Sequence, residues 1–80
     1  MKITEAVSAR LLELCKERNI TVNKMCTLSA VTQSTANDIV NLRSKNPGIV
    51  TIKKLCDGLE ISVGDFFDSP LFRNLEQEIQ

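Results

Sequence analysis

The stretch from Met25 to Lys45 constrains the fold more than any other part of the chain. It reads as a short helix, a tight turn and a second helix, because its apolar residues recur at spacings of three and four. The second segment has Ala36, Ile39 and Val40 on one side. The other side carries short hydrogen-bonding side chains, namely Gln33, Ser34, Asn37, Asp38 and Asn41. Such a polar face, followed by Arg43 and Lys45, suits a helix that lies in a DNA major groove, although a surface helix that contacts nothing would show the same pattern.

Helical spacing continues on both sides of this stretch and predicts an all-α fold. Five helices are expected, over residues 4–18, 22–29, 33–41 and 50–59 and from Ser62 to Phe67. Asn19 is expected to end the first helix in a left-handed backbone, and Asn46-Pro47-Gly48 is a strong turn signal before the fourth. The apolar residues of the fourth helix are Val50, Ile52, Leu55, Cys56 and Leu59. The expected N-caps are Thr4, Thr21, Thr32 and Ser62.

Pro70 divides the chain into two expected parts, a compact domain over residues 1–69 and a tail over residues 70–80. In the tail, Phe72, Leu75 and Ile79 have the spacing of one helical face, with acidic residues on the other side. This pattern predicts a short helical tail. It leaves open whether the tail docks on its own domain or pairs with a second copy.

Composition narrows the class of protein. The chain has 80 residues, of which 42% are hydrophobic and 25% charged, as expected of one globular domain rather than a disordered segment. No apolar run is long enough for a membrane span and no signal-peptide pattern is visible, so we expect a soluble cytoplasmic protein without a membrane partner. Phe66 and Phe67 are expected in the core, although a platform that stacks on bases is the alternative.

Three cysteines, Cys15, Cys26 and Cys56, lie within apolar helical stripes. Redox sensing or metal binding would be the functional interpretations of these residues. The chain has no C-x-x-C pair and no histidine, so we expect neither a metal site nor a cofactor. The cysteines are therefore interpreted as small buried core residues in a reducing compartment.

The net charge is zero, but the charges are distributed unequally. Residues 1–54 carry nine Lys and Arg against four acids, whereas residues 55–80 carry Arg73 against six acids. This asymmetry indicates a basic face that can meet a polyanion and an acidic opposite end. Head-to-tail self-association is the alternative explanation.

Three segments resemble the lambda-repressor-like, Cro/C1-type helix-turn-helix regulators of the xenobiotic-response-element type. They are T-V-N-K-M-C-T-L-S-A-V-T-Q-S-T (21–35), N-L-R-S-K-N-P (41–47) and T-I-K-K-L-C-D-G-L-E-I-S-V-G-D-F-F (51–67). The resemblance covers about Val7 to Phe67 and implies a compact five-helix DNA-binding domain. The chain departs from the family pattern at Ala30, Leu42 and Glu60, where the family favours glycine. Either the backbone avoids the left-handed conformation at these sites or the domain tolerates strain of roughly 1 kcal/mol at each.

The resemblance also implies roles for individual residues. It places Gln33, Ser34 and Asn37 in the base-reading role, with Asp38 at the periphery. The positions that touch phosphate in the family correspond here to Thr32, Asn41, Arg43, Ser44 and Lys45, with Thr27 as a weaker candidate.

The expected function is therefore a small DNA-binding transcriptional regulator, in particular a repressor, that binds an operator as a homodimer with two half-sites about 34 Å apart. No small-molecule ligand is expected. A protein-interaction module of the same fold, such as an antitoxin or an anti-repressor, is the alternative. We do not expect an enzyme, because the chain has no histidine, no nucleophile elbow and no glycine-rich phosphate loop.

Overall fold

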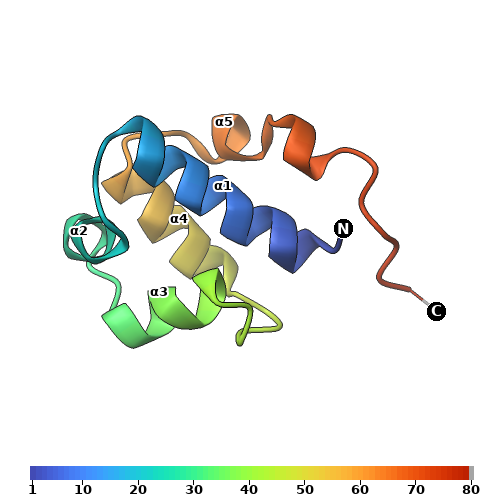
Figure 1. Cartoon of the computed structure of the whole chain (residues 1–80), viewed down its shortest axis with the longest axis horizontal. Coiled ribbons are helices and arrows are strands. Elements are labelled where there is room, and N and C mark those ends of the chain that lie inside the picture. Colours follow the sequence, from blue (N-terminus) through green and yellow to red (C-terminus); the bar gives the residue numbers. More distant parts are fainter. Residues whose placement is uncertain (80) are drawn as a thin grey trace.

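The computed structural model describes residues 1–79, and within them five α-helices follow one another without a strand (Figure 1). The helices are α1 (Ile3–Glu17), α2 (Val22–Ser29), α3 (Gln33–Val40), α4 (Ile49–Gly58) and α5 (Val63–Phe67), and a single 3₁₀ turn, η1 (Pro70–Phe72), comes after them. The expected all-α, five-helix fold is confirmed. None of the helices described is long and apolar enough to cross a lipid bilayer.

Three of the four expected N-caps are confirmed. The hydroxyls of Thr21, Thr32 and Ser62 each accept a hydrogen bond from the backbone N–H three residues later. The prediction of Thr4 as the cap of the first helix is wrong, because α1 begins at Ile3 and its N-cap is Lys2, two residues earlier. No side chain caps this helix start, but the Glu5 carboxylate reaches back and accepts the Lys2 N–H at 2.9 Å. Thr4 consequently lies inside the first turn.

The core draws on all five helices. Leu11, Met25, Leu55 and Phe66 are fully buried, and all three cysteines are buried as well. Phe66 and Phe67 are core residues rather than a base-stacking platform. Their rings pack edge to face at 4.9 Å between centroids, and the Phe67 ring packs on Phe72 at the same distance.

The expectation that Val50 lies on the buried side of the fourth helix is wrong. It is 66% exposed, and Ile49 before it is 76% exposed, so the buried side of α4 begins at Ile52. At its other end α4 crosses α2 closely. Gly58 makes this approach possible, because a Cβ there would lie 2.8 Å from the backbone N and Cα of Ser29.

Left-handed backbone occurs at all three sites where the family favours glycine. The φ angles are 53° at Ala30, 64° at Leu42 and 56° at Glu60, and Asn19 adopts the same conformation as expected. After each of these residues the next N–H donates to the carbonyl five residues back, as in a Schellman motif. Of the two alternatives, the strained one therefore applies. The turns after α2, α3 and α4 have left-handed residues with a β-carbon where glycine would be unstrained.

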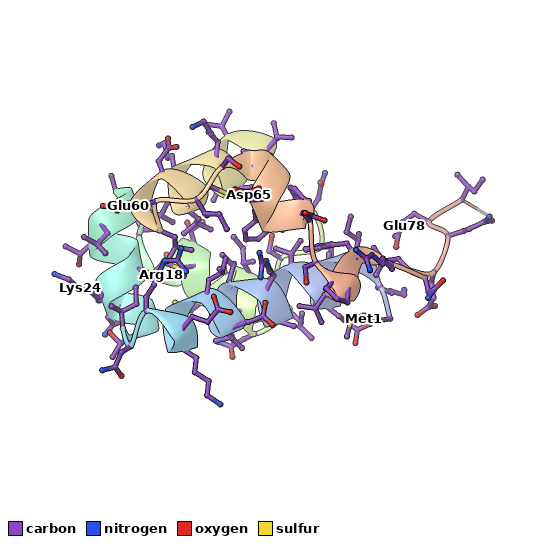
Figure 2. All side chains as sticks on the ribbon, turned by 90° about the horizontal axis from the view of Figure 1, so that it is seen from above. Met1, Arg18, Lys24, Glu60, Asp65 and Glu78 are labelled. Carbon is purple, nitrogen blue, oxygen red and sulfur yellow. The ribbon has the colours of Figure 1, made fainter. Side chains whose placement is uncertain are left out.

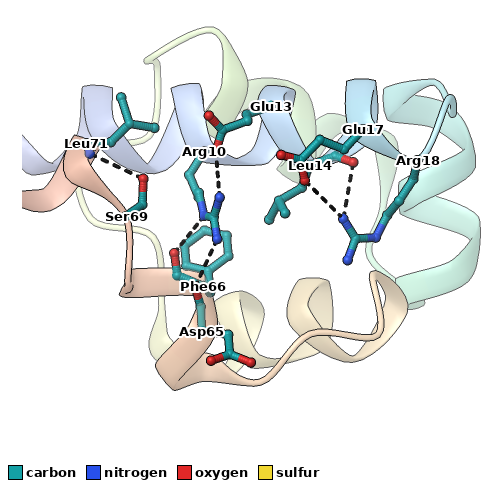
Figure 3. Close-up of polar contacts among 9 residues, drawn as sticks. All are labelled: Arg10, Glu13, Leu14, Glu17, Arg18, Asp65, Phe66, Ser69 and Leu71. Atoms are coloured by element: carbon teal, nitrogen blue, oxygen red, sulfur yellow. Dashed lines mark hydrogen bonds and ion pairs between the residues drawn. The ribbon is translucent and has the colours of Figure 1, made fainter.

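Arg10 of α1 and Arg18, the C-cap of α1, bind the ends of other helices, and Figure 3 shows the contacts of Arg10. Arg10 donates from Nε to the Phe66 carbonyl at 2.8 Å and from Nη2 to the Asp65 carbonyl at 2.9 Å, so it caps α5. Arg18 donates from Nε to the Leu59 carbonyl at 2.8 Å, just past α4. Because charged donors near a helix C-terminus are favourable, these contacts hold α4 and α5 against α1.

The tail docks on its own domain along α1. η1 packs against α1, and the Glu76 N–H then donates to the Met1 carbonyl at 3.0 Å. The Met1 amino group also lies 3.2 Å from the Glu76 carboxylate. Residues 73–79 have irregular backbone, so the helical part of the tail is limited to η1. In Figure 2, Glu78 lies beyond Met1 at the end of the molecule opposite Lys24.

Candidate nucleic-acid interface

The outer face of α3 is uncovered. Gln33 and Ser34, at the N-terminal end of the helix, are exposed, and Asn37 one turn later is half-buried. The helix is held by its opposite side, where Ala36 and Ile39 are buried. Figure 1 shows α3 at the edge of the molecule opposite α5. The polar face predicted from the sequence is therefore available for contact with a large partner.

Asp38 and Arg43 form an ion pair at the far end of α3. The Arg43 Nε donates to Asp38 Oδ1 at 2.9 Å, and both side chains remain about half or more exposed. The pair neutralises one cation of the expected phosphate clamp and occupies one oxygen of the Asp38 carboxylate. Arg43 still presents its remaining N–H donors to solvent, because only Nε is bonded to Asp38.

The connection after α3 is fixed by its backbone. The Asp38 carbonyl accepts from the N–H groups of both Arg43, at 2.7 Å, and Ser44, at 2.9 Å. Leu42 turns the chain through its left-handed conformation, so that Arg43, Ser44 and Lys45 follow directly at the helix end. Lys45 is exposed and forms no ion pair among residues 1–79. Asn41, the C-cap, is exposed beside them.

The two threonines of the expected phosphate set both donate their hydroxyl proton inside the protein. Thr27, exposed on α2, donates to the Asn23 carbonyl at 3.2 Å. Thr32 accepts from the Thr35 N–H at 3.3 Å and donates to the Thr35 hydroxyl oxygen at 2.9 Å. A phosphate oxygen needs a donor, so each threonine would have to exchange its internal hydrogen bond for an external one. Thr32 lies directly at the start of α3, beside Gln33.

The sequence analysis assigned all Lys and Arg of residues 1–54 to one basic face. In the structure, some of these side chains are bonded within the protein and others remain beside α3. Arg10 and Arg18 are bonded to carbonyls at the ends of α5 and α4, and Lys53 pairs with Asp57 on α4. The charges of these three residues are therefore used in contacts within the protein. Arg43 and Lys45 directly follow α3, and Lys2 lines a depression together with Lys45. A charge count by itself could not reveal this division, because it depends on which carbonyls the long side chains reach.

The three cysteines do not have the surroundings of reactive or metal-binding thiols. Burial raises the pKa of all three thiols, Cys15, Cys26 and Cys56, above the usual value. Buried thiols with a raised pKa are weak nucleophiles and weak metal ligands at neutral pH. Within the part of the chain that the structure describes, no group of three metal-ligating side chains comes together.

Comparisons with known proteins agree with this geometry. The family model of the Cro/C1-type HTH DNA-binding domain matches residues 10–70, which is more than half of the chain and includes α2, α3 and the connection after it. The chain is similar in structure to the crystal structure of the prophage Lp1 protein 11, with a TM-score of 0.81 and 46% sequence identity. That similarity covers 94% of this chain and 100% of the other. A search of curated proteins gives no significant match.

Proposed function

Because this chain belongs to the family of Cro/C1-type helix-turn-helix DNA-binding domains, we propose that it is a transcriptional repressor that places α3 in the major groove of duplex DNA. The observation that carries the proposal is the bare outer face of α3, with Gln33 and Ser34 exposed at its N-terminal end. The first residues of a recognition helix enter the groove, and here they are amide and hydroxyl side chains that can read base edges.

Gln33 and Asn37 are the proposed base-reading residues, because an amide can bond adenine at two atoms in the major groove. Ser34 contributes a hydroxyl that can donate or accept. Asp38 has the peripheral role, since its ion pair with Arg43 leaves it one unpaired oxygen that could accept from cytosine. Asp38 would also hold the Arg43 guanidinium close to the DNA backbone.

The proposed phosphate contacts surround this helix on both sides. Lys45, Ser44 and Arg43 follow the C-terminal end of α3, together with the C-cap Asn41. Thr32 lies at the N-terminal end, and Thr27, which belongs to α2 rather than α3, is the weakest member. Such contacts set the position of a domain on the duplex and carry no sequence information themselves.

The proposed binding unit is a homodimer. One domain of this size contacts few base pairs, whereas a two-fold dimer places two α3 helices one helical turn, about 34 Å, apart on one face of the DNA. The operator is then expected to consist of two inverted half-sites.

Selection of bound fragments from random duplex DNA, followed by measurement of Gln33→Ala, tests the proposal. Gln33→Ala should lose about 1–3 kcal/mol on the selected site and little on random DNA, while Lys45→Ala should weaken both alike. Asn23→Ala, an exposed amide on α2 outside the proposed contacts, is the matched control. Equal loss by Gln33→Ala on both DNAs would remove it from base reading.

The salt dependence separates this function from a protein-interaction module of the same fold. DNA binding should weaken with a log–log slope near −0.9 for each phosphate neutralised. If no duplex is selected, or if binding is insensitive to salt, the proposal fails.

A further inference from the structure

The contacts of the tail determine where Glu78 lies. After η1, which packs against α1, the chain turns at Asn74 in a left-handed conformation with φ of 59°. Asparagine adopts this conformation more readily than most residues. The Glu76 N–H then donates to the Met1 carbonyl at 3.0 Å. The tail backbone is therefore held against the start of α1 two residues before Glu78.

Glu78 shares one surface depression with two residues of the proposed phosphate set. The depression has a volume of about 260 Å³, and Ser44 and Lys45 line it together with Glu78. Glu78 and Lys45 are both exposed, and neither forms an ion pair among residues 1–79. Screening at physiological salt extends over about 8 Å, so charges that face one small depression interact through the solvent.

We propose that Glu78 attenuates DNA binding by competing with a DNA phosphate for Lys45 and Ser44. This inference rests on the proposed function, because that function assigns these two residues to phosphate. The Glu78 carboxylate is a negative charge beside the place that a phosphate oxygen would take, and like charges repel. When a phosphate binds, the Glu78 side chain turns away from Lys45, while the docked tail backbone stays in place.

Glu78 differs from the other acidic residues at this end of the molecule. Glu5 accepts the Lys2 N–H, and Glu76 pairs with the Met1 amino group, so both carboxylates hold parts of the fold together. The charge asymmetry of the sequence predicted that the acidic residues lie opposite the basic face. Glu78 instead lies beside the connection after α3, where its charge acts on Lys45.

Neutralising Glu78 in the full chain tests the proposal. Glu78→Gln should bind a selected duplex and random duplex DNA about twofold to fivefold more tightly than the wild type, and this gain should shrink as the salt concentration rises. Both DNAs gain alike because phosphate contacts carry no sequence information. Glu60→Gln, which removes the same charge from an exposed residue at the other end of the molecule (Figure 2), is the matched control and should bind like the wild type. Glu78→Gln should bring no gain when Lys45→Ala is already present.

Backbone amide shifts of the free protein test the contact without DNA. Glu78→Gln should shift the Ser44 and Lys45 amides, and Glu60→Gln should leave them unchanged. Unshifted amides, a gain in affinity that persists with Lys45→Ala, or equal affinity of Glu78→Gln and the wild type for a duplex that both bind would overturn the attenuation and leave the proposed function intact. If neither the wild type nor any variant binds a duplex, the proposed function fails and the attenuation fails with it.

Discussion

Replacing the left-handed residues by glycine should stabilise this protein, and the structure allows the size of the effect to be worked out. Ala30 and Glu60 have φ angles of 53° and 56°, a conformation that costs a residue with a β-carbon about 1–2 kcal/mol. Glycine removes this cost but gains freedom in the unfolded chain, which returns about 0.5–1 kcal/mol. The net gain is about 0.5–1 kcal/mol for each site. Because both side chains are exposed, no burial is lost.

The double variant Ala30→Gly/Glu60→Gly should therefore be about 1–2 kcal/mol more stable than the wild type. Its melting temperature should rise by roughly 4–16 °C. Leu42→Gly should gain little, because the relief of strain at φ 64° is offset by the loss of a half-buried leucine, worth about 1 kcal/mol. Urea unfolding followed by circular dichroism measures the two free-energy differences, and a thermal scan of the same signal measures the melting temperature.

Glycine within regular helix provides the control for this experiment. Lys16→Gly lies in the last turn of α1, with ordinary helical backbone, and should lose about 1 kcal/mol. Asn19→Gly should change little, since asparagine tolerates the left-handed region well. If Ala30→Gly and Glu60→Gly destabilise the protein as Lys16→Gly does, the inference that these turns are strained is wrong.

Three further predictions concern the close approach at Gly58, the Arg10 contacts and the thiols. Gly58→Ala should destabilise the protein by about 1–3 kcal/mol in thermal unfolding, because its Cβ would meet the Ser29 backbone, whereas Gly64→Ala should not, because its Cβ would make only an ordinary contact with Ser62 Oγ at 3.9 Å. Arg10→Met should cost about 1.5–3 kcal/mol in urea unfolding by leaving two carbonyls at the end of α5 without their charged donor, while Arg43→Met should cost less than about 1 kcal/mol. Because burial raises the thiol pKa values, the unfolded chain releases these protons first, so the free energy of unfolding should fall as the pH rises above about 9, and a smaller slope in Cys56→Val would identify the source.

The helices and most of their boundaries could be predicted because they depend on local sequence. Spacing of apolar residues fixed which side of each segment is buried, and the hydroxyls of Thr21, Thr32 and Ser62 marked where helices begin. Thr4 was the exception, since the Glu5 carboxylate can reach back to the Lys2 N–H and start the helix earlier. The prediction that Val50 is buried was also wrong, because the first turn of α4 extends past the core and the buried side of the helix begins at Ile52.

Contacts between distant segments could not be predicted in the same way. Nothing near Arg10 in the sequence indicates that its guanidinium reaches the carbonyls of Asp65 and Phe66. The same holds for Gly58, whose missing side chain matters only because Ser29 lies against it. The ion pair between Asp38 and Arg43 is closer in sequence, but it forms only because Leu42 turns the chain back through left-handed backbone.

The most direct test of the proposed DNA contact is to map backbone amide chemical shifts on addition of a selected duplex. We expect the largest changes on Gln33, Ser34 and Asn37 and on residues 43–45, with the tail unchanged. Changes confined to α1, α5 or the tail, with the outer face of α3 unaffected at saturation, would contradict the claim that this face is the DNA-reading surface.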